Sequence, residues 1–153
     1  MDASAPAQPE PQALAEACAR AMWAEDQASQ SLGMRIERIA PGEAVLTMTV
    51  AERMVNGHGI CHGGFIFTLA DSAFAFACNT YDRRTVAQHC AVTFIAPSRL
   101  GEVLSAHALE VSRAGRSGIY DVTVTGDGGA VVAEFRGHSR TIKGSLLGGE
   151  GRP

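Results

Sequence analysis

One stretch constrains the fold of this chain more than any other: an apolar run that begins at a pair of glycines and contains a single carboxylate. The run extends from Gly63 to Asn79, and after Gly64 it contains neither glycine nor proline. A run of this length favours a helix over a strand. Its apolar residues lie all round the helical wheel, which is typical of a helix buried at the centre of a fold. We therefore expect a central helix that ends near Tyr81.

The carboxylate in this run, Asp71, is the first candidate for a chemical role. Asp is a poor helix former, and an ionised carboxylate in apolar surroundings is strongly unfavourable unless it is paired or hydrogen-bonded. One interpretation is structural, with Asp71 bonded to a nearby backbone group or hydroxyl. The other is that Asp71 acts as a nucleophile or general base in a site that excludes water.

The two glycines at the helix entrance, Gly63 and Gly64, also have two interpretations. Glycines can simply permit a tight turn. They can also let a ligand approach the free N–H groups at the positive end of the helix dipole, where an oxyanion is stabilised in acyl transfer. Gly63 and Asp71 are eight residues apart, or about 12 Å along a helix axis. Because reacting atoms must approach to about 3–3.5 Å, one substrate can use both groups only if Asp71 comes from a second subunit.

Two polar residues, His62 and Asn56, flank the glycines in the preceding loop. Such residues are often only capping or turn-forming, but here they are also placed to align a substrate by hydrogen bonding. A rival interpretation combines His58, Cys61 and His62 as a metal site. These three residues crowd into five positions and match no usual zinc spacing, so we expect no metal.

The remaining sequence predicts one mostly β domain between two tails. We expect a disordered tail over 1–11, a single domain over 12–143 and a flexible Gly-rich tail over 144–153. Inside the domain, a helix over Gln12–Ser29 precedes two strands, and four strands follow the central helix. The expected strands are Met34–Ile39, Leu46–Val50, Thr85–Pro97, Glu102–Arg113, Ser117–Thr125 and Ala130–Ile142. Short turns between consecutive strands predict antiparallel pairing.

Composition argues against several classes of partner. The formal net charge of −3 gives no electrostatic case for binding nucleic acid. The longest apolar run is too short for a membrane span and is interrupted by Asp71. The four cysteines form no CxxC pair, and the N-terminus lacks the apolar segment of a secretory signal, which indicates free thiols in the cytoplasm.

The turn between the fourth and fifth expected strands carries Arg113, Arg116 and Ser117. One interpretation is a solvated hairpin. The other is a cationic rim that contacts the phosphates of a ligand.

Several segments together resemble the hotdog-fold acyl-CoA thioesterases, and among these the bacterial phenylacetic acid degradation thioesterases. The segments are Asn56–Gly64, Leu69–Ala75, Val92–Pro97, Gly118–Val122 and Phe135–Gly137. The resemblance implies an α+β hotdog fold, in which a curved antiparallel sheet wraps a long central helix, here with an N-terminal helix added. It also implies a homodimer with a continuous sheet, commonly a tetramer made of two dimers, and no metal or prosthetic group.

The resemblance also implies roles for the candidate residues. Asp71 matches the family's nucleophile or base for water, and the backbone N–H of Gly63 matches its oxyanion donor. His62 and Asn56 match the loop residues that orient the thioester and the lytic water, and Gly64 lies beside the substrate. The family's CoA phosphates lie near the strand turns, which favours a binding role for Arg113, Arg116 and Ser117.

We therefore expect hydrolysis of an acyl-CoA thioester, such as phenylacetyl-CoA or hydroxyphenylacetyl-CoA, in cross-subunit sites. Some relatives carry a Ser near the start of the strand after the helix, whereas Val86–His89 contains no hydroxyl. Three alternatives stay open: a thioesterase for a different acyl chain, a hotdog hydratase, and a catalytically silent acyl-CoA-binding module. A hydratase would need an Asp/His pair around one water, and silent binding is disfavoured by the presence of Asp71.

Overall fold

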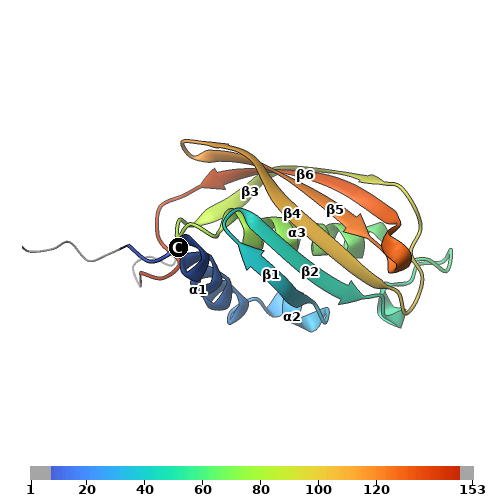
Figure 1. Ribbon diagram of the computed structural model, residues 1–153. Coiled ribbons are helices and arrows are strands. Elements are labelled where there is room, and N and C mark those ends of the chain that lie inside the picture. Colours follow the sequence, from blue (N-terminus) through green and yellow to red (C-terminus); the bar gives the residue numbers. More distant parts are fainter. Residues whose placement is uncertain (1–7, 149–153) are drawn as a thin grey trace, which may run out of the picture.

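The computed structural model describes residues 8–148, in which a six-stranded antiparallel sheet curves around one long helix, α3, Gly63–Cys78 (Figure 1). Helices α1 (Pro11–Trp23) and α2 (Gln27–Ser31) precede the sheet. The strands are β1 (Arg35–Ala40), β2 (Glu43–Thr49), β3 (Thr85–Phe94), β4 (Val103–Ala114), β5 (Ser117–Thr125) and β6 (Val131–Thr141). The α+β architecture and the order of the elements confirm the predicted fold class.

The core forms where one side of α3 lies on the concave face of the sheet. Phe74 is fully buried, and its ring centroid lies 5.6 Å from that of Tyr120 and 5.9 Å from that of Phe135. A Cβ atom added at Gly137 would lie 2.8 Å from the Phe74 ring, so β6 needs a glycine there to admit the ring. Truncation of a buried Phe to Ala typically removes about 3–5 kcal/mol of stability, so this contact is a large part of what fixes α3 to the sheet.

The opposite side of α3 remains partly open. Phe65, Thr68, Asp71, Ser72 and Ala75 are half-buried, whereas the side toward the sheet is buried. Their spacing of three and four residues places them in one stripe along the helix. The sheet therefore covers only part of a helix that is apolar all round. None of the described helices is long and apolar enough to cross a membrane.

The predicted single helix over Gln12–Ser29 is wrong, because the chain breaks between α1 and α2. The Asp26 side chain accepts a hydrogen bond from the Ser29 N–H at 2.9 Å, and so caps a new helix. The Ser29 hydroxyl donates to the Asp26 carboxylate at 2.7 Å and lies 2.9 Å from the Ser72 hydroxyl of α3. This capping and the contact with α3 explain the break.

The strand order is β1-β2-β4-β5-β6-β3. The predicted pairing of consecutive strands is therefore wrong for β3 and β4, because β4 lies between β2 and β5 while β3 pairs with β6. The connection between β3 and β4 spans the end of the sheet, where the Ser98 carbonyl accepts a hydrogen bond from the Cys61 N–H at 2.8 Å. As an end strand of the described sheet, β3 leaves one of its edges without a strand partner in residues 8–148.

The expected tails lie partly outside the described residues, which exclude 1–7 and 149–153. Within 144–148, Ser145 and Leu146 make hydrogen bonds to the Asp82 carboxylate at 2.7 and 2.9 Å. The division into tails and one domain stays a prediction.

Candidate functional site

The first part of the site is the N-terminus of α3, where one backbone donor is left free. His62 is the N-cap residue, and its Nδ1 accepts a hydrogen bond from the Gly64 N–H at 2.9 Å. The His62 carbonyl accepts from the Phe65 N–H at 3.0 Å. No acceptor in residues 8–148 takes the Gly63 N–H. This free N–H at the positive end of a helix is suited to bind an oxyanion.

Both glycines are closely approached by a side chain. A Cβ atom at Gly63 would lie 2.7 Å from Cζ of Phe94, because the Phe94 ring of β3 rests against the Gly63 backbone. A Cβ atom at Gly64 would lie 3.0 Å from His62 Nδ1, so a larger residue would crowd the cap. The glycine pair thus brings an edge-strand aromatic ring and a capping imidazole next to the free donor.

Asn56 lies beside this donor, in the loop that precedes α3. Its side-chain Oδ1 accepts from the His58 N–H at 2.9 Å, and its backbone N–H donates to the Ile60 carbonyl at 2.9 Å. These bonds shape the loop and leave the Asn56 amide NH2 without an acceptor among the described residues. Asn56 and Gly63 line one cavity of about 540 Å³ together with Ile60, Cys61, Ile66 and Phe94–Pro97.

Asp71 lies two helical turns beyond this cavity, on the open stripe of α3. The only hydrogen bond to its carboxylate within the described chain comes from the Cys90 thiol of β3, with Sγ 3.9 Å from Oδ1. Burial raises the pKa of Asp71, and the Cys90 contact lowers it to a smaller extent. The chain therefore holds the free Gly63 N–H and the Asp71 carboxylate in separate places, as the eight-residue spacing requires.

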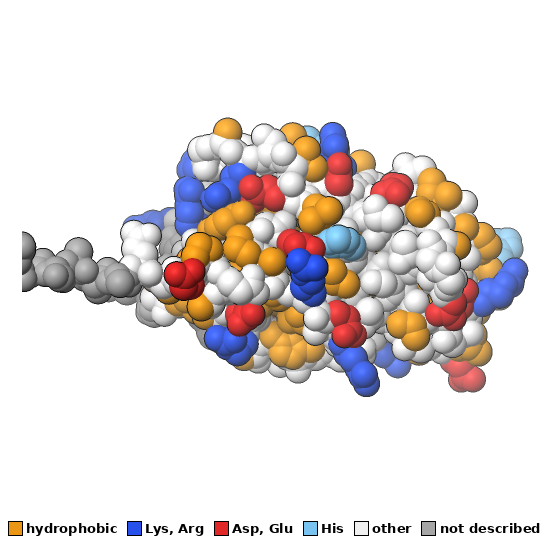
Figure 2. All heavy atoms as spheres, viewed as in Figure 1, with side chains coloured by type: hydrophobic (Ala, Val, Ile, Leu, Met, Phe, Trp, Pro, Cys, Tyr) orange, Lys and Arg blue, Asp and Glu red, His pale blue; other side chains and the backbone are white. Residues whose placement is uncertain are grey.

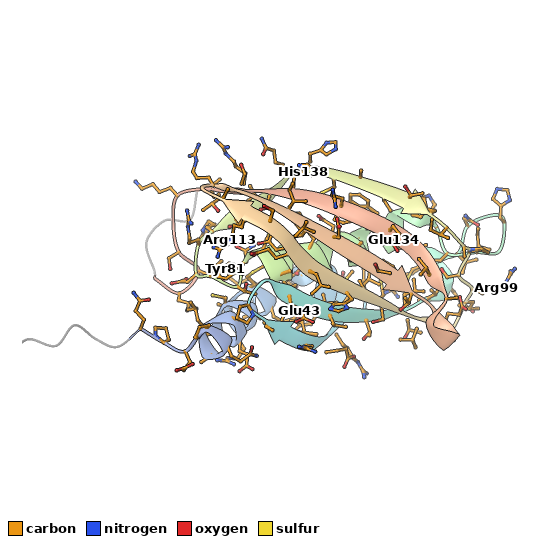
Figure 3. All side chains as sticks on the ribbon, turned by 45° about the horizontal axis from the view of Figure 1, so that its top comes forward. Glu43, Tyr81, Arg99, Arg113, Glu134 and His138 are labelled. Atoms are coloured by element: carbon orange, nitrogen blue, oxygen red, sulfur yellow. The ribbon has the colours of Figure 1, made fainter. Side chains whose placement is uncertain are left out.

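The predicted cationic rim lies at the other end of α3. The Arg113 guanidinium carbon stands 3.6 Å from the centroid of the Tyr81 ring, and Arg113 Nε lies 3.5 Å from Glu110 Oε2. Figure 3 shows Arg113 and Tyr81 together at the end of the molecule opposite Arg99. Arg116 and Ser117 are exposed in the same hairpin, and Arg116 forms no ion pair within residues 8–148.

Two features of the structure were not found from the sequence. The sequence predicts Cys90 only as a free thiol, whereas its inward position on β3 brings it to Asp71. Glu110 was not singled out, although its Oε2 accepts hydrogen bonds from the hydroxyls of Tyr81 and Tyr120, each at 2.9 Å. Both contacts join residues distant in sequence, so only the sheet register could have revealed them.

Two features of the structure are relevant to metals and charged partners: the grouping of side chains that could bind a metal, and the distribution of charge on the surface. Across the described residues, no three His, Cys, Asp or Glu side chains are grouped in a way that could hold a metal ion. His58, Cys61 and His62 therefore form no such group. Figure 2 shows acidic and basic side chains interspersed over most of the face in view, with several Lys and Arg side chains gathered at its upper left end.

The geometry defines the class first: a curved antiparallel sheet around a long helix whose glycine N-terminus faces a cavity is the hotdog thioesterase fold. Residues 58–133 match the family described as the thioesterase superfamily. The chain is 41% identical over 130 residues to the acyl-coenzyme A thioesterase PaaI of Escherichia coli, a match that covers 85% of this chain and 93% of that protein. The chain therefore belongs to the thioesterase superfamily and is a thioester hydrolase.

Two solved structures support this assignment. The structure of the E. coli PaaI protein from the phenylacetic acid degradation operon matches with a TM-score of 0.87 and 39% identity, and covers 89% of this chain and 99% of that one. A variant of the phenylacetic acid degradation protein PaaI from Thermus thermophilus matches with a TM-score of 0.72 and 38% identity, and covers 74% and 97%.

Proposed function

We propose that this protein hydrolyses aryl-acetyl-CoA thioesters, phenylacetyl-CoA or hydroxyphenylacetyl-CoA, to the free acid and CoA, in the catabolism of aromatic compounds. The observation that carries the proposal is the free Gly63 N–H beside an apolar cavity. The similarity to thioesterases named for phenylacetic acid degradation supports the choice of acyl group.

In the proposed reaction, the thioester carbonyl accepts a hydrogen bond from the Gly63 N–H, and the carbonyl carbon is attacked by Asp71 or by a water that Asp71 activates. Asp71 either adds to the carbonyl carbon directly or removes a proton from a water that adds to it. The charge that develops on the carbonyl oxygen is stabilised by the Gly63 donor and the helix dipole. The carbon–sulfur bond then breaks, and CoA leaves as a thiolate that takes up a proton. His62 and Asn56 hold the loop and orient the thioester and the water.

The active site is formed between two subunits of a homodimer. Along β3, Phe94 lies against Gly63 and Cys90 lies against Asp71. These two contacts are four residues apart, about 13 Å along a strand, which matches the distance of about 12 Å between Gly63 and Asp71 along α3. An antiparallel β3–β3 contact that places Cys90 near the partner's Phe94 therefore brings Asp71 to the partner's Gly63.

Two further observations support this dimer. The outer edge of β3 has no strand partner among the described residues, and a second β3 would satisfy its backbone groups. The open stripe of α3 that contains Asp71 would be covered by the facing subunit. We further propose that two such dimers form a tetramer and that the protein is cytoplasmic, as the family resemblance and the free thiols suggest.

The proposed β3–β3 pairing also supports a role for the β4–β5 hairpin in binding CoA. The Arg116 carbonyl accepts a hydrogen bond from the Thr141 N–H, and Thr141 pairs with Thr85 at the start of β3. Antiparallel pairing places the start of one β3 near the end of the other. Arg113, Arg116 and Ser117 would then lie at the same end of the assembly as the partner's Gly63 and Gly64, where they would bind the CoA phosphates.

Subunit complementation tests the proposed site. Asp71→Asn removes the carboxylate, and Gly63→Ala forces the Phe94 ring away from the helix entrance; each homodimer should be inactive. Mixing the two variants under conditions of subunit exchange should restore activity, because a mixed dimer contains one intact site. If exchange is verified by mass spectrometry and activity does not return, the cross-subunit site is wrong.

A hydrolysis screen over aryl and aliphatic acyl-CoAs tests the substrate. We expect the highest kcat/KM for phenylacetyl- or hydroxyphenylacetyl-CoA. A clear preference for an aliphatic chain would favour the alternative of a thioesterase with another substrate. Binding of acyl-CoA without turnover of any member of the panel would favour a silent binding module.

A further inference from the structure

The inference concerns Cys90 and rests on the proposed role of Asp71. A β-bulge in β3 orients the Cys90 side chain toward α3. The pairing of β3 with β6 shifts register between Ala87 and His89, so that Gln88 is the extra residue. After the bulge, Cys90 pairs with Gly137. A Cβ atom added at Gly137 would point at Phe74 in the core, so this position of the pair faces inward. Because side chains alternate along a strand, a β3 without the bulge would turn the neighbouring residue inward instead of Cys90.

The inward-facing Cys90 thiol contacts the Asp71 carboxylate, which has no stronger hydrogen-bond donor among the described residues. The Cys90 Sγ lies 3.9 Å from Asp71 Oδ1, and no other described side chain or backbone N–H donates to either oxygen of Asp71. We propose that Cys90 is a positioning residue of the hydrolase: its thiol holds Oδ1 of Asp71 and leaves Oδ2 free for the substrate or the lytic water.

A thiol is suited to this position because it is a weak hydrogen-bond donor. A strong donor at the same place, such as a guanidinium or a backbone N–H, would stabilise the carboxylate anion and make it a poorer nucleophile and base. A purely apolar residue would leave the buried anion without any partner and free to rotate. The Cys90 thiol fixes the orientation of the carboxylate with little loss of basicity.

The ionisation states of the neighbouring groups agree with this role. Burial, and then the charge of Asp71, raise the pKa of Cys90 to about 11, so the thiol keeps its proton in any ordinary assay. From α3 itself, the buried Cys78 is the other titratable group that interacts with Asp71, and burial raises the pKa of Cys78 to about 12. Both groups are neutral, and no charged side chain among residues 8–148 pairs with Asp71.

Two substitutions, one that removes the thiol and one that replaces it with a shorter hydroxyl, test the proposal. Cys90→Ala removes the donor, so the pKa of Asp71 should rise and the acidic limb of the kcat/KM profile should move to higher pH. At neutral pH we expect kcat to fall about threefold to tenfold, the order of effect of losing one weak hydrogen bond. Cys90→Ser should move the limb in the same direction but by less, because the shorter C–O bond places Oγ farther from Oδ1 than Sγ, which is already 3.9 Å away. Cys18→Ala, in α1, is the matched control and should leave the profile unchanged.

The outcomes separate this proposal from the proposed function. If Asp71→Asn retains near-normal turnover, the mechanism itself fails. If Asp71→Asn is inactive while both Cys90 variants lower kcat without moving the limb, Cys90 only fills space and the positioning role is wrong. Infrared titration of isotope-labelled Asp in wild type and Cys90→Ala measures the carboxyl pKa without catalysis, and an unchanged value would also overturn the role.

Discussion

The middle of α3 and the region beyond its C-terminus each hold a half-buried carboxylate, in opposite surroundings. Glu110 accepts hydrogen bonds from Tyr81 and Tyr120, each at 2.9 Å, and lies 3.5 Å from Arg113 Nε. Asp71 has a single thiol partner at 3.9 Å. The polar groups around Glu110 are mutually satisfied, whereas those around Asp71 are not.

This difference distinguishes a carboxylate that stabilises the fold from one that is available to react. Buried polar groups are normally hydrogen-bonded, and a shortage of partners raises the free energy of the folded state. Residues that reduce stability in this way are common at functional sites. Loss of a hydroxyl that donates to Glu110 should therefore lower stability, and loss of the Asp71 carboxylate should lower activity.

The largest expected effect is on catalysis. Asp71→Asn should lower hydrolysis by about 10²–10⁴-fold, the usual contribution of a general base. Its thermal stability should equal or exceed that of the wild type, because burial disfavours the charge that the substitution removes. Asp121→Asn is a control: Asp121 is an exposed carboxylate that accepts from Arg136 at 2.6 and 2.7 Å, and its loss should leave kcat unchanged. A clear loss of stability in Asp71→Asn would contradict the comparison.

The converse effect is expected at the other carboxylate. Tyr120→Phe removes only the buried hydroxyl that donates to Glu110, and should lower the free energy of unfolding by about 1.5–3 kcal/mol, as for hydrogen bonds to charged groups. Urea denaturation measures this change. Activity per folded molecule should stay at the wild-type level, and a selective loss of kcat would show that the two regions are not separate.

The dependence of stability on pH should differ between Asp71 and Asp121. Burial raises the pKa of Asp71 in the folded state, so its contribution is most favourable below the unfolded pKa of about 3.9 and is lost as the pH rises through the folded value. The stability of wild type relative to Asp71→Asn should therefore fall from acidic to neutral pH. The hydrogen bond from Arg136 lowers the pKa of Asp121, so the difference from Asp121→Asn should change in the opposite direction. Urea denaturation of the wild type and both variants at several pH values measures these two stability differences. If the two differences change with pH in the same direction, this assignment is wrong.

The smallest effect is expected in the exposed hairpin. Arg116→Ala should raise KM for acyl-CoA about 2–5-fold, consistent with the modest energy of solvent-exposed ion pairs. KM for the same acyl group on pantetheine, which lacks the nucleotide phosphates, should not change. Arg35→Ala removes an equally exposed positive charge from β1 and serves as the control. Equal changes with both substrates would exclude a phosphate contact.

The sequence predicted those features that depend on local pattern. The length and apolarity of α3 identified the central helix, and its eight-residue spacing separated Gly63 from Asp71. The sequence indicates the glycine pair but not the contact made at Gly63, because Phe94 reaches it from a strand and lies 31 residues further along the chain. The pairing of β3 with β6, and with it the position of Cys90, depends on sheet order, which short turns do not determine.

The free edge of β3 has a consequence for handling this protein. Every second residue of the ten-residue strand β3 presents its backbone donor and acceptor on the edge that has no strand partner in the described chain. An open edge of this length is a template for unspecific strand pairing and aggregation. Variants that disrupt the dimer elsewhere, and so leave this edge uncovered, should therefore precipitate rather than persist as soluble monomers. A low yield of such variants would report on assembly rather than on folding of the protomer.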